Sequence, residues 1–153
     1  MNKKVTTLLS ILLLWCAAVS AQEGQKSDLQ QRAEAAAKDG TIATTRYLYI
    51  RAFEDYVNKG QIEKGVDCGV KATALYYKEN YYKEAFDLLR RIDQSIIASK
   101  QGSEGAALHY LATKERMQMY IKLRKGESAK EQLNIMETQV STAGSESLRN
   151  DLL

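Results

Sequence analysis

The sequence predicts an all-α protein made of antiparallel helix hairpins, and three observations support this class. Apolar residues recur at intervals of three and four along most of the chain, which is the spacing of one helix face. Single glycines separate these stretches, and a glycine just past a helix end takes the left-handed conformation at little steric cost. Proline is absent from the 153 residues, whereas hydrophobic residues make up 44% and charged residues 27%. This composition is typical of a globular chain.

The apolar stripes locate the helices along the chain. Four stripes keep the helical spacing over several turns. They are Tyr49, Ala52, Phe53, Tyr56 and Val57; Tyr82, Ala85, Leu89, Ile92 and Ile96; Ala106, Tyr110, Thr113, Met117, Tyr120 and Ile121; and Ala129, Leu133, Met136 and Val140. The predicted helices are near residues 27–38, 42–58, 61–78, 81–99, 104–125 and 127–142, and a seventh begins at Ser145. Such short connections force neighbouring helices to be antiparallel.

Polar and glycine residues mark the predicted helix ends. The glycines that follow helical stretches are Gly40, Gly60, Gly102, Gly126 and Gly144. An N-cap side chain accepts a hydrogen bond from a free amide of the first turn. The residues with a suitable side-chain oxygen are Thr41, Asn80, Ser103 and Ser145. We therefore expect helices to begin at or just after these four positions.

A recurring spacing links the end of one helix to the start of the next. Tyr76 precedes Ala85 by nine residues, and Tyr120 precedes Ala129 by the same interval. The later apolar positions of these two copies are Leu89 and Leu133, and a weaker third copy pairs Tyr56 with Gly65. A small residue lets two helices approach, and the ring fills the wedge beside it. This spacing resembles that of Tyr and Ala in tetratricopeptide repeats, a family that forms right-handed helical solenoids.

The resemblance to tetratricopeptide repeats is incomplete. The consensus proline is missing, and the steps between the three tyrosines are 20 and 44 residues rather than constant. The uneven steps would arise if helix 61–78 were both the second helix of one pair and the first of the next. A generic helical bundle is the alternative fold.

A second resemblance to a known family rests on three segments. They are the run from Tyr76 to Ala85, the tail 146–153 and the N-terminal apolar segment. They are similar to the N-terminal region of Bacteroidetes-type sensor proteins. In that family a periplasmic stack of tetratricopeptide-like helices precedes a transmembrane helix and a cytoplasmic histidine kinase or DNA-binding output domain. The present sequence has no second hydrophobic span, phospho-accepting histidine motif or nucleotide-binding glycine box. The resemblance therefore implies a sensor region without its output domain.

An export signal precedes the predicted helical domain. Residues 1–4 are basic, residues 5–19 are apolar, and small residues follow. The apolar run is shorter than the roughly 20 residues that span a bilayer. We therefore predict a cleaved signal peptide at 1–21, a tetratricopeptide-like domain at 22–153, and an exported, periplasmic protein. A membrane anchor is the alternative.

A lipoprotein attached at Cys16 is a further alternative, but Trp15 is too bulky for that cleavage site. Removing the signal takes away Lys3 and Lys4 and no acidic residue, so the net charge falls from +3 to +1. The mature chain then has no basic stripe, and we expect no nucleic-acid partner. At the other end, Leu152 stops the seventh helix after barely two turns with its apolar residues unpartnered. We therefore expect the natural polypeptide to continue.

Few residues in this sequence suit catalysis or metal binding. His109 is the single histidine, and Cys68 is the one cysteine left after removal of the signal, so a structural zinc site cannot be assembled from them. We expect Cys68 to be buried and His109 to be partly exposed. Glu84 and Asp87 share a helix face near Arg91, which indicates surface ion pairs. The prediction is a protein without catalytic residues, metal or cofactor.

The tyrosines are the candidate binding residues. The chain has nine tyrosines and two phenylalanines. Tyr76 and Tyr82 fall on apolar stripes and should be core residues, whereas Tyr77 and Tyr81 point elsewhere. Amphipathic rings are favoured at interfaces, so these two are candidates for a ligand or partner surface. The alternative is that they pack on a neighbouring repeat.

These observations favour a periplasmic sensor module that binds a protein, peptide or small molecule. Signalling would proceed by a change in helix packing or dimer geometry, which implies a second copy of the chain as a partner. The module would be attached to the inner membrane only through a C-terminal segment absent from this sequence. The alternative is a free periplasmic interaction scaffold.

Overall fold

The computed structural model describes residues 25–152, and within them the chain forms seven α-helices and no strands. The helices are α2 (Asp28–Lys38), α3 (Ile42–Asn58), α4 (Ile62–Lys78), α5 (Tyr82–Ser99), α6 (Gly102–Lys122), α7 (Gly126–Ala143) and α8 (Glu146–Leu152). The all-α class is confirmed, and the predicted helix ends differ from the observed ones by at most three residues. The predicted signal peptide lies outside the described residues.

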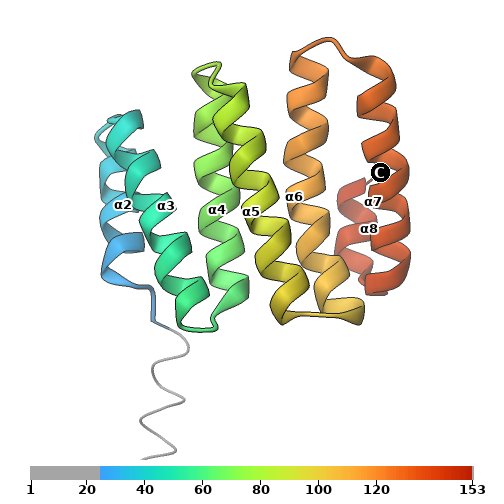
Figure 1. Ribbon diagram of the computed structural model, residues 1–153, viewed down its shortest axis with the longest axis horizontal. Helices are drawn as coiled ribbons and strands as arrows, with labels where there is room; N and C mark the ends of the chain where they lie inside the picture. Colours follow the sequence, from blue (N-terminus) through green and yellow to red (C-terminus); the bar gives the residue numbers. More distant parts are fainter. Residues whose placement is uncertain (1–24, 153) are drawn as a thin grey trace, which may run out of the picture.

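The helices lie side by side in chain order (Figure 1), and α8 folds back beside α7. Consecutive helices pack against each other, and α6 packs against both α4 and α5. The arrangement is that of a helical stack in which most contacts join sequence neighbours.

One tight turn recurs at four of the helix connections. In each copy the residue between the two helix caps is left-handed: Gly40, Gly60, Asn80 and Arg124, with φ of 74°, 72°, 68° and 56°. The amide of the following residue donates back to a carbonyl five residues earlier, as in a Schellman motif. The four bonds are Thr41 N to Ala36 O at 3.2 Å, Gln61 N to Tyr56 O at 2.8 Å, Tyr81 N to Tyr76 O at 2.9 Å and Lys125 N to Tyr120 O at 2.9 Å.

This turn explains the nine-residue spacing found in the sequence. Tyr56, Tyr76 and Tyr120 supply the carbonyl acceptors, and Gly65, Ala85 and Ala129, nine residues later, are buried in the first turn of the next helix. At Gly65 a Cβ atom would lie 3.1 Å from Val57 Cγ2, so the two helices approach closely there. A fourth copy joins Ala36 to Thr45, which is 2% exposed. The sequence pattern missed this copy because an alanine stands in the tyrosine position.

The main core surrounds α4. Gly69 lies at its centre, where a Cβ atom would be 2.7 Å from Ile92 Cδ1 on α5 and 3.3 Å from Phe53 Cδ2 on α3. Leu89 and Ile92 are fully buried in the same cluster, to which α6 adds Leu108 and other apolar residues. Because α4 has no side chain at Gly69, α3 and α5 can both pack closely against it.

The packing of α6 and α7 differs from the predicted stripes. Leu133 and Ile121 are exposed by 36% and 59%, whereas Gln132 is 6% exposed. Leu133 and Gln132 both lie about one turn after Ala129, so the helical period alone does not tell which of them faces α6. The repeat-packing role expected for Leu133 is therefore not observed, while Met136 and Val140 of the same stripe are buried.

Some of the predicted helix starts also differ. Ser145 caps α8, because its Oγ accepts a 3.4 Å hydrogen bond from the Leu148 amide. Thr41 precedes α3 without a side-chain capping bond. Asn80 takes the left-handed turn position instead of an N-cap, and Ser103 lies inside the first turn of α6. Asparagine tolerates the left-handed conformation better than most residues, which explains its use there.

The C-terminal helix is attached to the stack by side chains. Tyr110 Oη on α6 donates a 2.8 Å hydrogen bond to Asp151 Oδ2. Leu148 and Leu152 pack against a small cluster that contains Tyr110 and Met136. Leu152 was expected to be unpartnered, and this expectation is wrong.

Candidate functional site

An open groove lies between α3 and α5. It has a volume of about 480 Å³. Val57 and Ala98 supply apolar surface to the groove, whereas the Phe53 ring is only 2% exposed there. The remaining lining side chains are polar: Glu54, Asn58, Arg91, Gln94, Ser95 and Ser99. An apolar patch with surrounding hydrogen-bonding groups suits a polypeptide segment, whose backbone and side chains need both.

An ion pair joins the two sides of this groove. Arg91 Nη2 lies 2.7 Å from Glu54 Oε1, and the Arg91 guanidinium lies 5.6 Å from the centre of the Phe53 ring. The sequence suggested pairing of Arg91 with acids on its own helix, but Asp87 pairs with Arg90 instead. The sequence could not identify Glu54 on α3 as the partner of Arg91, because helical spacing reveals only neighbours on the same helix.

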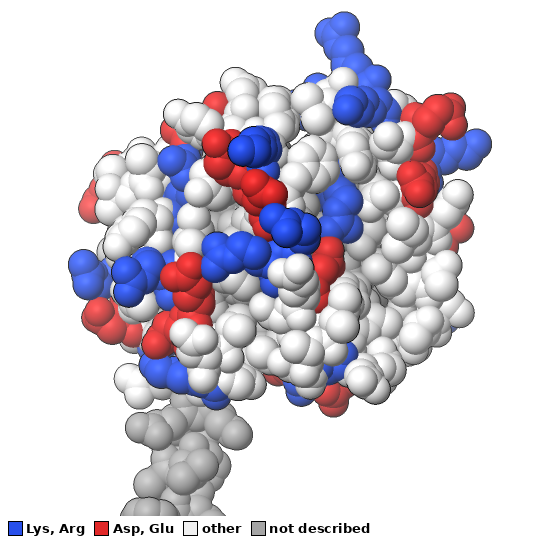
Figure 2. Space-filling model, in the orientation of Figure 1, with Lys and Arg blue, Asp and Glu red and all other residues white. Residues whose placement is uncertain are grey.

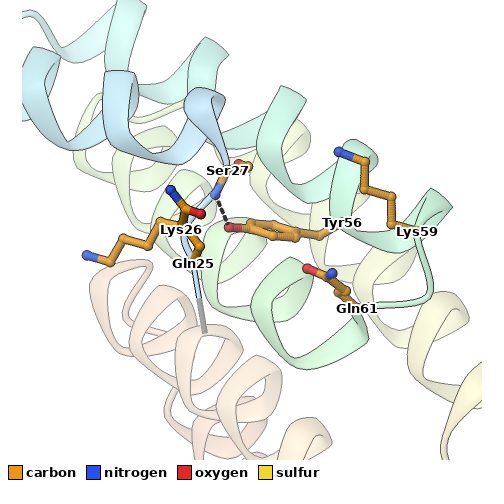
Figure 3. A pocket seen from close by; sticks show the side chains of 6 residues that line it. All are labelled: Gln25, Lys26, Ser27, Tyr56, Lys59 and Gln61. Carbon is orange, nitrogen blue, oxygen red and sulfur yellow. Dashed lines mark hydrogen bonds between the residues drawn. The ribbon is translucent and has the colours of Figure 1, made fainter. Parts of the chain in front are cut away.

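A second hollow of about 270 Å³ lies where α2 begins beside the end of α3 (Figure 3). The Tyr56 hydroxyl accepts a 2.6 Å hydrogen bond from the Ser27 amide and donates at 2.7 Å to Gln30 Oε1. Lys26 and Lys59 line the hollow from opposite sides of the Tyr56 ring (Figure 3). These lysines also form ion pairs with Glu34 and Asp55, each at 2.7 Å. The hydrogen bonds of Tyr56 thus hold the start of α2 against α3.

Tyr77 and Tyr81 do not form one surface. Tyr77 is half-buried, and its hydroxyl donates a 2.7 Å hydrogen bond to Gln118 Oε1 on α6. Lys122 Nζ donates to the Tyr77 carbonyl at 2.6 Å. Tyr77 therefore packs on the neighbouring hairpin, which was the alternative considered from sequence.

Tyr81 is 48% exposed and belongs to a cluster on α3 and the α4–α5 turn. Its ring meets the Tyr76 ring edge to face, with centroids 6.4 Å apart. The Arg46 guanidinium lies 4.6 Å from the Tyr76 centroid and 5.3 Å from the Tyr81 centroid. Arg46 also forms an ion pair with Glu79. The chain's own cation thus lies against these two rings.

His109 is paired with an acid, and Cys68 lies in the core. His109 Nδ1 lies 2.9 Å from Asp93 Oδ1, and the other Asp93 oxygen accepts from Arg116 at 2.5 Å. Cys68 is fully buried, and burial raises the pKa of its thiol to about 12, so the thiol is protonated at neutral pH. Within residues 25–152, no three His, Cys, Asp or Glu side chains are grouped so that they could hold a metal ion. Tyr82 is only half-buried, although its stripe suggested a core position.

Basic and acidic side chains alternate over the face seen in Figure 2, and the area over α7 and α8 at the lower right is largely uncharged. The helices from α2 to α8 are all too short or too polar to cross a membrane. Comparisons with protein-family models, with curated proteins and with solved structures find no match. The groove between α3 and α5 therefore stands as the candidate site on its geometry alone.

Proposed function

We propose that this chain is a tetratricopeptide-like binding scaffold that takes a polypeptide segment in the groove between α3 and α5. The observation that carries the proposal is the apolar surface of Val57 and Ala98 in an open groove with hydrogen-bonding side chains around it. The proposal gives the chain no catalytic role.

The repeat arrangement is supported by the way two hairpins stack. The α4/α5 and α6/α7 hairpins share the same tight turn, and the first helix of the second hairpin packs against both helices of the first. In helical repeat proteins each unit contacts its neighbours in this manner and an extended surface results.

We further propose that the scaffold is exported and serves as the periplasmic sensor module of a signal-transduction protein. The support is the resemblance of the N-terminal segment, the run from Tyr76 to Ala85 and the C-terminal tail to such sensors. A free periplasmic scaffold is the alternative. Coding DNA beyond codon 153 distinguishes them: the sensor requires a hydrophobic span of about 20 residues followed by an output domain, and a stop codon there favours the scaffold.

Photocrosslinking tests the groove directly. A benzoylphenylalanine replaces Gln94 in the groove or, as the matched control, exposed Glu131 on α7. We expect an adduct with a polypeptide after irradiation in the producing cell from the Gln94 position and not from the Glu131 position. Equal adducts at both positions, or none at Gln94, would contradict the proposed groove.

A further inference from the structure

The connection between α5 and α6 differs from the others between α2 and α7. Lys100 and Gln101 are extended, with φ and ψ of −134° and 135° for the first and −129° and 171° for the second. The other four connections use the tight turn with its backbone hydrogen bond. The position of α6 on α4 and α5 therefore depends on contacts between the helices, because the tight hydrogen-bonded turn is not used at this connection.

Polar side chains supply several of these contacts. The Tyr77 hydroxyl of α4 donates to Gln118 Oε1 at 2.7 Å, and Lys122 Nζ donates to the Tyr77 carbonyl at 2.6 Å. On α5, Asp93 binds both Arg116 and His109 of α6. These bonds lie near a half-buried acid that follows Lys114 on α6.

That acid is Glu115. Its Oε2 atom is buried and has no hydrogen-bond partner. The adjacent Lys114 Nζ donates to both carboxylate oxygens of Asp151 on α8, each at 2.6 Å. An ionised carboxylate that is buried with few donors is unfavourable. Burial accordingly raises the pKa of Glu115 above its ordinary value of 4.5, against the opposing effects of Tyr77 and Lys114.

Glu115 lies three residues before Gln118 on α6 and therefore shares the helix face that meets the Tyr77 hydroxyl. Burial, followed by the charge of Glu115, raises the pKa of Tyr77 to about 12, so the phenol keeps its single proton. That proton lies on the bond to Gln118. A protonated Glu115 can donate to the Tyr77 oxygen while Tyr77 donates to Gln118. An ionised Glu115 has no proton to give and competes with Gln118 for the phenolic proton.

We propose that Glu115 makes the packing of α6 on α4 a proton-responsive joint, which is tight when the carboxyl is protonated and looser when it is ionised. The joint links the α4/α5 and α6/α7 hairpins, so its state changes the geometry of the stack. The inference stands apart from the proposed groove, because it needs no ligand.

Other charged groups that face α6 are paired with it. Asp93 on α5 is bound by Arg116 and His109. Asp151 on α8 is bound by Lys114. From α7, Gln132 and Gln139 contribute buried amides, each with an unpartnered Oε1 oxygen, so they add acceptors and no charge.

The direction of the pH effect follows from the raised pKa of Glu115. A carboxyl with a higher pKa in the closed state binds its proton more tightly there than in the open state. Its stabilising effect is complete below pH 4.5 and is lost as pH rises through the raised pKa. Each unit of elevation corresponds to about a tenfold change in the closed-to-open ratio.

Hydrogen exchange of the α6 amides tests the joint. The protection factors of α6 and α3, corrected for intrinsic exchange, are measured between pH 4 and 8 by mass spectrometry. For the wild type we expect α6 protection to fall severalfold relative to α3 as pH rises. Glu115→Gln keeps the shape, cannot ionise and should make the ratio independent of pH. Exposed Glu131→Gln on α7 is the matched control and should behave like the wild type.

Two results would overturn the proposal. One is the same pH dependence in the wild type and in Glu115→Gln, and the other is an equal loss of protection in α3 and α6. Titration of the Glu115 carboxyl in the wild type by carbon-13 NMR provides a measurement that needs no variant. A midpoint at or below pH 4.5 would also refute the joint.

Discussion

At the residue scale, Gly69 has a packing role that its sequence context did not reveal. In the sequence Gly69 is only a small residue in the helix predicted near 61–78, and its close approach to α5 is evident from the positions of Ile92 and Phe53 beside it. Distances of this kind depend on which helices meet, and that information is spread over residues far apart in the chain. Burial of Cys68 and partial exposure of His109, in contrast, follow from helical periodicity and are confirmed.

Replacing Gly69 by alanine should destabilise the protein. The new Cβ would lie 2.7 Å from Ile92 Cδ1 and 2.9 Å from Ile92 Cγ1, and Ile92 is fully buried. Overpacking of a core typically reduces the free energy of unfolding by about 1–3 kcal/mol, which exceeds the gain of up to about 1 kcal/mol in helix propensity. Urea denaturation followed by circular dichroism measures the difference.

Gly126→Ala is the matched control, because nothing lies within 4 Å of its new Cβ and its φ is negative. This variant should be neutral or slightly more stable. A Gly69→Ala protein as stable as Gly126→Ala would contradict the tight packing of α4 between α3 and α5.

At the scale of elements, the sequence predicted the helices well because two local signals agree. Apolar spacing identified each helix, and glycine after a helix end identified Gly40, Gly60, Gly102 and Gly144 as left-handed positions. Asn80 and Arg124 occupy the same position without glycine, so the common turn was visible only in part. Gly126 is the exception: it begins α7 with a negative φ, because Arg124 and Lys125 already complete the turn before it.

The turn geometry predicts opposite effects for two substitutions. Arg124 has a φ of 56°, and an L-residue with a side chain is strained there by about 1–2 kcal/mol. Arg124→Gly should therefore raise the free energy of unfolding by up to about 1 kcal/mol, after the entropy of the unfolded glycine is subtracted. Gly60→Ala, at a φ of 72°, should lower it by about 1 kcal/mol. Thermal and urea unfolding give both values, and equal signs would disprove the shared turn.

At the scale of the whole molecule, the stack could be predicted and the groove could not. Short connections already require neighbouring helices to be antiparallel, and the tyrosine-to-small-residue spacing indicated close helix pairs. The groove depends on α3 and α5, which are separated by α4 in sequence and joined by the pair of Glu54 and Arg91. The high tyrosine content made Tyr77 and Tyr81 candidates for a binding surface. Tyrosine content is an indirect signal of binding, since a ring can equally well pack between repeats.

Unequal packing along the stack predicts that α8 opens first. The main core draws on α2 to α6, whereas α8 adds only Leu148 and Leu152 to a small cluster with Tyr110. In a stack of units, local stability follows the contacts that each unit makes with its neighbours. Amide protection should therefore be highest in α3, α4 and α5 and lowest in α8, as measured by hydrogen exchange at neutral pH.

Asp151 should make this opening acid-sensitive. Hydrogen bonds from Lys114 and then Tyr110 hold the pKa of Asp151 below its ordinary value of 3.8. A lowered pKa in the docked state means that docking is fully supported above pH 3.8 and weakens as pH falls through the lowered value. Asp151→Asn should reduce α8 protection at neutral pH and remove its acid dependence, and protection of α3 should not change. Glu115 acts in the opposite direction, because it loosens the α4–α6 contact as pH rises. The two acids should therefore give α8 and the α4–α6 joint opposite responses to pH. Loss of α3 protection in Asp151→Asn, equal to that of α8, would show instead that α8 opens only with the whole molecule.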